Sequence, residues 1–204
     1  MPIRFVTSNE GKADEAREYL DDVERVDYDY TEVQGDLATV AAAGAREAFE
    51  ALGGVDPVLV DDAGLFVRAL DGFPGPYSSF VEDTLGVDRV WRLCEAEDDR
   101  RAHFRTVLAY AHRPDDAGDG GDGEETGESD NAVQVETFEG SVPGTIVAPR
   151  GDGGFGYDPI FEHDGTTMAE MSTAEKNAVS HRGRALAKFA DWLAGEPADT
   201  KGAK

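Results

Sequence analysis

A short polar segment near the N-terminus, Thr7-Ser8-Asn9-Glu10-Gly11-Lys12, combines small side chains with one lysine. It follows a strand-like stretch and precedes a helical pattern, so it would lie at the beginning of a helix. The free N–H groups and the positive dipole end of a helix start attract phosphate groups, and Lys12 adds a compact positive charge. The spacing is not that of a Walker A loop. The segment predicts a phosphate site of another kind, although a capped helix with a surface lysine fits the same residues equally well.

Two adjacent carboxylates, Asp61 and Asp62, follow the apolar run Val58–Val60. We expect this run to be a short buried strand, with both acids at its end. Carboxylate oxygens are ligands suited to Mg²⁺. Because side chains alternate along a strand, only one of the two acids would face a given cleft. We favour a magnesium site over the alternative, in which Asp61-Asp62-Ala63-Gly64 only caps a loop.

The glycine-rich segment Gly153–Pro159 carries two aromatic residues and an acid, Phe155, Tyr157 and Asp158. Aromatic side chains in such a loop can stack on a nucleobase, or they can fill the protein core. Both interpretations stay open from these residues alone. A second segment, Gly72–Ser78, is rich in glycine and proline and predicts a rigid turn.

Lys176, His181 and Arg182 lie within seven positions of one another near the start of the last predicted helix. The chain has five lysines in all, and Lys12 and Lys176 are the only two before residue 188. A lysine, a histidine and an arginine so close together in an acidic chain predict a pocket for an anion. The alternative is ordinary charge pairing at the start of a surface helix.

The composition is strongly acidic, with 43 Asp and Glu against 19 Lys and Arg and a formal net charge of −24 over 204 residues. Such a surface repels nucleic acids and anionic membranes. At molar salt the Debye length shrinks to about 3 Å, so the self-repulsion is largely screened. We therefore expect a protein from the cytoplasm of an extreme halophile; an acidic mesophilic protein with a disordered tail is the alternative. The single cysteine, Cys94, excludes an intrachain disulfide, and we expect no signal peptide and no membrane partner.

Hydrophobic periodicity places these segments on alternating strands and helices. The predicted strands are Pro2–Thr7, Glu24–Tyr30, Val58–Val60, Phe66–Leu70, His103–Ala111 and Ala132–Val147, and the predicted helices are Gly11–Leu20, Ala38–Leu52, Val87–Ala96 and Ser180–Leu193. This order predicts an α/β or α+β protein with a mixed central sheet and flanking helices. We expect one domain over residues 1–195, with an acidic disordered loop inserted at 114–131 and a tail at 196–204.

Five segments taken together resemble the inosine triphosphate pyrophosphatase family. They read TSNEGK, DDAGL, GFPGPY, GFGYDP and EKNAVSHR, and their order and spacing match that family's pattern over about residues 3 to 194. The segment Thr31–Gly35 is similar to the family's P-E-x-Q-G motif. The resemblance implies two α/β lobes around a long mixed sheet, an active-site cleft between the lobes, and a homodimer. It also implies Mg²⁺-dependent hydrolysis of ITP, dITP or XTP to the monophosphate and pyrophosphate.

The resemblance assigns a role to each matching residue. Glu32 and Asp62 would hold Mg²⁺, Asp62 would be the general base, and Lys12 would assist the leaving pyrophosphate. The other substrate-binding residues would be Thr7, Ser8, Asn9, Glu10 and Gly11 for the triphosphate, Phe155, Gly156, Tyr157 and Asp158 for the base, and Lys176, His181 and Arg182 to complete the pocket. Four positions depart from the family: Asp61 replaces a frequent Glu, Ala63 replaces a Ser or Thr that often touches substrate, and Gly44 and Ser79 stand where some relatives carry lysines.

Three other functions remain as alternatives. The first is a Maf-like pyrophosphatase for modified pyrimidine nucleotides. The second is a regulator that binds nucleotides without turnover, which the presence of Glu32 and Asp62 argues against. The third is an acidic scaffold that acts through residues 115–130.

Overall fold

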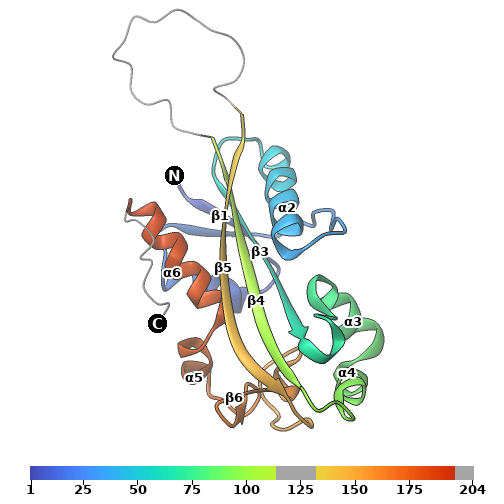
Figure 1. The fold of residues 1–204 in the computed structure, drawn as a ribbon. Coiled ribbons are helices and arrows are strands. Elements are labelled where there is room, and N and C mark those ends of the chain that lie inside the picture. Colours follow the sequence, from blue (N-terminus) through green and yellow to red (C-terminus); the bar gives the residue numbers. More distant parts are fainter. Residues whose placement is uncertain (114–131, 196–204) are drawn as a thin grey trace, which may run out of the picture.

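A seven-stranded mixed sheet runs through the protein, whose computed structural model describes residues 1–113 and 132–195 (Figure 1). The strands are β1 (Ile3–Val6), β2 (Val23–Val26), β3 (Val58–Val67), β4 (Arg101–His112), β5 (Gln134–Ile146), β6 (Phe161–His163) and β7 (Thr166–Thr167), in the order β2-β1-β3-β4-β5-β6-β7. The strand β1 pairs in parallel with β2 and β3, and all later pairings are antiparallel. The predicted mixed sheet of an α/β protein is confirmed. The predicted loop 114–131 and tail 196–204 lie outside the described residues.

Six α-helices flank the sheet in the described part of the chain. They are α1 (Glu10–Arg17), α2 (Leu37–Ala51), α3 (Ser78–Leu85), α4 (Val87–Cys94), α5 (Thr173–Ala178) and α6 (His181–Leu193). Short 3₁₀ turns occupy Arg68–Leu70, Gly75–Tyr77 and Asp158–Ile160. None of these helices is long and apolar enough to cross a membrane.

The helices cover both faces of the sheet. On one face α2 packs Ala45 and Phe49 against β3 and β4, and on the other face Ala16 of α1 and Leu186 of α6 pack around Leu59 of β3. Burying these apolar stripes stabilises the sheet at roughly 25 cal/mol per Å² of apolar surface.

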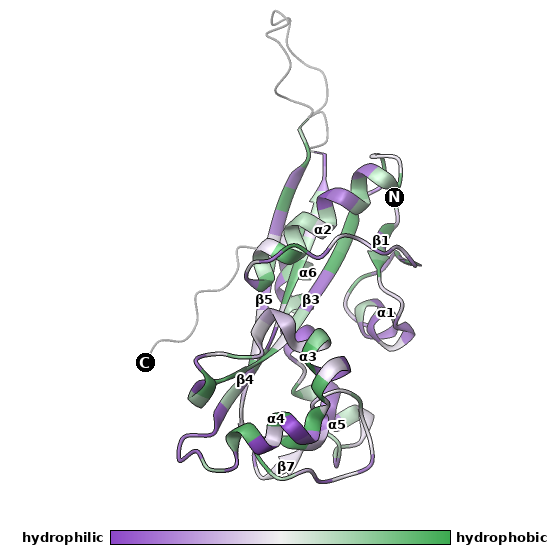
Figure 2. Cartoon of the chain, turned by 90° about the vertical axis from the view of Figure 1, so that its right-hand side faces the viewer, coloured by the Kyte–Doolittle hydropathy of each residue, from purple (hydrophilic) through white to green (hydrophobic). Residues whose placement is uncertain are grey.

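A third apolar cluster fills the other end of the long strands. There Leu65 of β3 and Val142 of β5 pack with Val90 of α4 and Ile160 of the segment before β6. Figure 2 shows that α4 carries both strongly hydrophilic and apolar residues, as expected of a short helix with one buried side. The molecule therefore has a helical lobe at each end of β3, β4 and β5 (Figure 1).

The predicted break between two strands near Asp61 is wrong. The strand β3 continues through both acids to Val67, and the separate strand expected over Phe66–Leu70 is the end of β3 followed by a 3₁₀ turn. Asp62 and Gly64 stay paired with Val107 and Arg105 of β4, so the backbone ladder is unbroken. A strand continues as long as a neighbouring strand supplies backbone hydrogen-bond partners, even where its residues are polar. Here the longer strand β4 supplies these partners.

Two helices and the two short strands β6 and β7 were not predicted. The helix α3 buries only Ser78 and Val81, and α5 buries none of its residues, so neither carries a recognisable apolar stripe. The predicted strand Glu24–Tyr30 is shorter and ends at Val26.

Candidate active site

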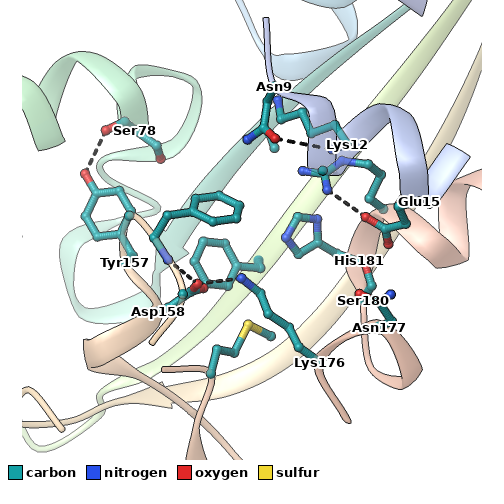
Figure 3. Close-up of a pocket in the computed structure, with 18 of the residues that line it drawn as sticks. Asn9, Lys12, Glu15, Ser78, Tyr157, Asp158, Lys176, Asn177, Ser180 and His181 are labelled. Carbon is teal, nitrogen blue, oxygen red and sulfur yellow. Dashed lines mark hydrogen bonds and ion pairs between the residues drawn. The ribbon is translucent and has the colours of Figure 1, made fainter. Parts of the chain in front are cut away.

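A cavity of about 480 Å³ lies where the two lobes meet (Figure 3). This volume is in the range of small-molecule sites in proteins. Its lining comes from the start of α1, the middle of β3, α3, the loop before Ile160, and the segment from α5 into α6. The lining runs from Asn9 near the N-terminus to Arg182 in the last helix, so the fold brings distant parts of the sequence to one cavity.

A buried network of four charges connects α1, β3 and α6 at the base of this cavity. Asp61 accepts hydrogen bonds from Lys12 Nζ at 3.0 Å and from Arg182 Nε at 2.9 Å, and Arg182 Nη1 donates to Glu15 at 2.7 Å. Burial opposes ionisation of Asp61, but the charges of Lys12 and then Arg182 hold its pKa at about 2. Two carboxylates therefore balance two cations, and this balance holds Lys12 and Arg182 beside the cavity.

Asp62 lies on the other side of β3 from Asp61. Val58 and Val60, which share a face of the strand with Asp62, pack against α2. Leu59, which shares a face with Asp61, packs against α1 and α6. The expectation that the two acids point in different directions is confirmed.

Asp62 forms no ion pair with another residue of the described structure, and the charge of Lys12 acts on it only weakly. Its Oδ2 is buried without a hydrogen-bond partner among the described residues. Burial, followed by the nearby charges of Asp61 and Glu32, raises the pKa of Asp62 to about 7. The predicted magnesium ligands thus lie within electrostatic reach of each other, with Glu32 on an exposed loop between β2 and α2. Neither Glu32 nor Asp62 is among the residues that line the cavity, although Asp62 directly precedes the lining residue Ala63.

The N-terminal motif is only partly in the cavity. Asn9 caps α1 by accepting the N–H of Lys12 at 3.3 Å, and Asn9, Gly11 and Lys12 line the cavity. Thr7, Ser8 and Glu10 are not among its lining residues. The hydroxyl of Thr7 instead accepts the N–H of Asn9, which fixes the turn into the helix.

The carboxylate of Glu10 is used elsewhere. It binds Arg17 at 3.0 Å and Arg25 at 2.7 Å on the protein surface. Of the two positions where the resemblance led us to expect a lysine, Ser79 lines the cavity. Gly44 packs in α2 under the ring of Tyr30, which fills the space that a side chain there would need.

The glycine-rich loop presents one aromatic face to the cavity. Phe155 is 58 % exposed, and Lys176 Nζ lies 4.2 Å from the centroid of its ring. Asp158 accepts the N–H of Phe155 at 2.8 Å and pairs with Lys176, so one carboxylate positions both. Gly154 is required here because its φ is +73° and a Cβ would overlap the Asp158 carboxylate.

Tyr157 lines the cavity but is buried in the apolar cluster that contains Leu65 and Ile160. Its hydroxyl donates to the backbone carbonyl of Ser78 at 2.8 Å, which ties the loop to the start of α3. The Ser78 hydroxyl in turn accepts the N–H of Leu65 on β3 at 2.8 Å. The loop is therefore anchored to β3 through Ser78.

His181 opens α6 and forms part of the cavity wall. Its Nδ1 lies 2.6 Å from the hydroxyl of Thr106 on β4, and its ring stacks on Phe104 at 5.2 Å. Burial, followed by the charge of Arg182, lowers the pKa of His181 to about 3. The imidazole is therefore neutral near pH 7.

Comparison with known proteins identifies the family. Residues 3–192 match the model of the Ham1 family. The chain belongs to the Ham1 family. A dITP/XTP pyrophosphatase of Thermococcus kodakarensis is 44 % identical over 201 residues, which cover 95 % of this chain and 97 % of that protein. An inosine triphosphate pyrophosphatase of Aspergillus fumigatus is 39 % identical over 196 residues, which cover 95 % of each chain.

Solved structures of Ham1 proteins share the fold. A HAM1 protein from Coxiella burnetii superimposes with a TM-score of 0.74 at 31 % identity and covers 96 % of this chain and 99 % of its own. The Staphylococcus aureus Ham1 protein gives a TM-score of 0.75 at 28 % identity, with the same two coverages.

Several residues of the Ham1 cavity were not predicted from the sequence. Glu15 follows Lys12 by three positions, and a carboxylate between the buried residues Ala13 and Ala16 is a signal that could have indicated a buried ion pair. Phe104 carries no such signal, because an aromatic residue in a strand is ordinary core. Met168, Met171, Thr173 and Asn177 also line the cavity, and their types and spacing are equally unremarkable for core or surface positions.

Proposed function

We propose that the chain hydrolyses purine nucleoside triphosphates with a 6-oxo base, such as ITP, dITP and XTP, to the monophosphate and pyrophosphate. The relatives named dITP/XTP and inosine triphosphate pyrophosphatase support this substrate class, because they match nearly the whole chain at about 40 % identity. The observation that carries the proposal is that Lys12, Lys176 and Arg182, from distant parts of the sequence, line one cavity, whose wall also includes Ala63, the residue after Asp62. These groups form a site for a polyanion in a protein whose net charge is −24.

The phosphate end of the substrate would lie at the start of α1. Asn9, Gly11 and Lys12 line the cavity there, and the first turn of a helix presents N–H groups and a positive dipole end. Lys12 would stabilise negative charge that develops on the leaving pyrophosphate. Its pairing with Asp61 keeps the ammonium group at a fixed position.

The base end would lie between the glycine-rich loop and α6. The exposed face of Phe155 offers a stacking surface, and Lys176 and His181 offer hydrogen-bond donors. A 6-oxo group accepts hydrogen bonds, whereas the 6-amino group of adenine donates them. A site built around such a hydrogen bond can reject the wrong partner by a factor of about 10⁴.

Mg²⁺ fits the pair Glu32 and Asp62. The buried Oδ2 of Asp62 has no partner among the described residues, and the like charges of Asp61 and Glu32 lie close to it. The described residues contain no group of three or more His, Cys, Asp or Glu that could hold a metal. Mg²⁺ is commonly bound by one or two carboxylates together with waters and substrate phosphates, so two acids suffice. When bound, Mg²⁺ would neutralise the phosphate oxygens.

The chemical step requires a water molecule, a base and a leaving group. The oxygen of the water forms a bond to the α-phosphorus while the bond from that phosphorus to the oxygen bridging to the β-phosphorus breaks. The pyrophosphate departs with the bonding electrons, and the water proton passes to the carboxylate of Asp62. Asp61 cannot take this role, because both of its oxygens are occupied by Lys12 and Arg182.

Release of pyrophosphate from a nucleotide panel, with and without Mg²⁺ in molar KCl, tests this proposal. We expect dITP, ITP and XTP to be cleaved far faster than ATP, and we expect chelation of the metal to stop turnover. Faster cleavage of dUTP or TTP than of dITP would indicate the Maf-like alternative, and binding without cleavage would indicate the regulator. A homodimer, a halophilic cytoplasm and the absence of nucleic-acid binding stay predictions.

A further inference from the structure

Thr106 is a buried polar residue that no step described above uses. It lies on β4 with 0 % of its surface exposed, paired with Ala63 of β3 and Gly140 of β5. Its Oγ1 is 2.6 Å from His181 Nδ1. Within residues 1–113 and 132–195 this hydroxyl has no other hydrogen-bond partner.

Gly140 explains how the two side chains come into contact. A Cβ at this position would overlap the backbone carbonyl of His181 and would lie 2.7 Å from the amide nitrogen of Ala185. The first turn of α6 therefore lies directly on β5, next to Thr106 in the register of the sheet. The strand fixes the hydroxyl and the helix fixes the ring, so the short contact is set by backbone packing on both sides.

The direction of this hydrogen bond decides which nitrogen of His181 carries the proton. If the Thr106 hydroxyl donates to Nδ1, the proton of the neutral ring is on Nε2. If Nδ1 donates instead, the hydroxyl proton is buried with no acceptor among the described residues, and an unsatisfied buried donor is costly. The first arrangement satisfies both groups.

The second ring nitrogen is then left available to a ligand in the cavity. His181 lines the cavity, its ring is held against Phe104, and Nε2 makes no hydrogen bond to a described residue. With the proton on Nε2 the ring offers the cavity a donor, and with the proton on Nδ1 it would offer an acceptor. The donor form would favour an oxo group on a purine base, and the acceptor form would favour an amino group.

We propose that Thr106 is a positioning residue for base selection, whose hydroxyl fixes His181 as the Nε2–H tautomer and thereby favours an oxo over an amino group on the base. This role rests on the proposed function of the cavity. Thr106 itself does not line the cavity, so it acts through His181.

The test compares Thr106→Val with Thr106→Ser. Valine keeps the volume and removes the hydroxyl, whereas serine keeps the hydroxyl. We expect Thr106→Val to lower the ratio of kcat/KM for dITP over dATP about tenfold, because a buried polar group left without its partner typically costs about fivefold to 100-fold. Thr106→Ser should keep the ratio within a factor of about 3 of the wild-type value. Thr167→Val is the matched control, because Thr167 is also fully buried and its hydroxyl lies 3.0 Å from both the Arg150 carbonyl and the Glu170 carboxylate, neither of which lines the cavity.

A direct measurement of the tautomer separates this inference from the proposed function. The chain has four histidines, so ¹⁵N spectra of the imidazole nitrogens can be assigned with His181→Asn. We expect the Nε2–H form in the wild type without any nucleotide, and a mixture of tautomers in Thr106→Val. A wild-type Nδ1–H form, an unchanged ratio in Thr106→Val, or an equal change in Thr167→Val would overturn the inference. Cleavage of no purine triphosphate would overturn the proposed function alone, and the spectra would still decide the tautomer.

Discussion

The replacement Asp61→Asn probes the charge network that holds the cavity together. The side chain of Asp61 is 2 % exposed and accepts hydrogen bonds from both Lys12 and Arg182. Asparagine has nearly the same shape but no charge. In the variant, Arg182 keeps only Glu15 as an ion-pair partner, and the ammonium group of Lys12 loses its carboxylate.

The expected loss of stability is large because the site is buried. Removing one member of a buried ion pair costs about 3–5 kcal/mol of unfolding free energy, since the remaining charge stays desolvated. For a chain of this size each kcal/mol corresponds to about 2–4 °C in Tm, so Tm should fall by roughly 6–20 °C.

Urea unfolding at fixed KCl measures this loss. Asp99→Asn is the matched control, because Asp99 binds Arg101 and Arg68 on the exposed surface. There water and salt screen the charges, so the change should be much smaller. The reasoning is refuted if Asp61→Asn costs no more than Asp99→Asn.

Three further changes test other parts of the site. The pKa of His181 is about 3 in the folded protein and 6.5 in the unfolded chain, so protons bind the unfolded chain first as the pH falls. Acidification from pH 6.5 to 5 should therefore lower the free energy of unfolding by about 2 kcal/mol through this residue. Urea titrations at both pH values should show this loss in the wild type and not in His181→Asn. Lys12→Met should lower kcat/KM for dITP by roughly 10²–10³, as for loss of one charge-stabilising donor, and a rate within threefold of wild type would contradict its role. Phe155→Ala should raise KM for dITP roughly tenfold or more through lost stacking, with little change in Tm because the ring is 58 % exposed; an unchanged KM would remove Phe155 from the base site.

The sequence predicted the central strands and the main helices because their apolar residues repeat with a clear period. The helix α2 and the strands β4 and β5 are long and carry buried residues along one or both faces. The break expected at Asp61 was wrong because a charge pattern was read as the end of a strand. The carboxylate of Asp61 is paired with Lys12 of α1 and Arg182 of α6, and the packing of these helices against β3 cannot be deduced from the strand sequence itself.

The candidate site was predictable to the extent that single residues stood out from their surroundings. Lys12 and Lys176 are rare cations in an acidic chain, and both line the cavity. Thr106 and Glu15 were not predictable, because their hydrogen-bond partners His181 and Arg182 lie 75 and 167 positions away in sequence. No local pattern indicates such contacts. The same holds for Gly140, whose missing side chain matters only because α6 packs on it.

A crystal structure of the Asp62→Asn variant with dITP and Mg²⁺ tests most directly whether one cavity holds the whole substrate. The account predicts the base against Phe155, with His181 and Lys176 at its edge, and the phosphates beside Lys12 at the start of α1. A nucleotide bound elsewhere, or bound with Lys12 and Lys176 contacting different molecules, would contradict it.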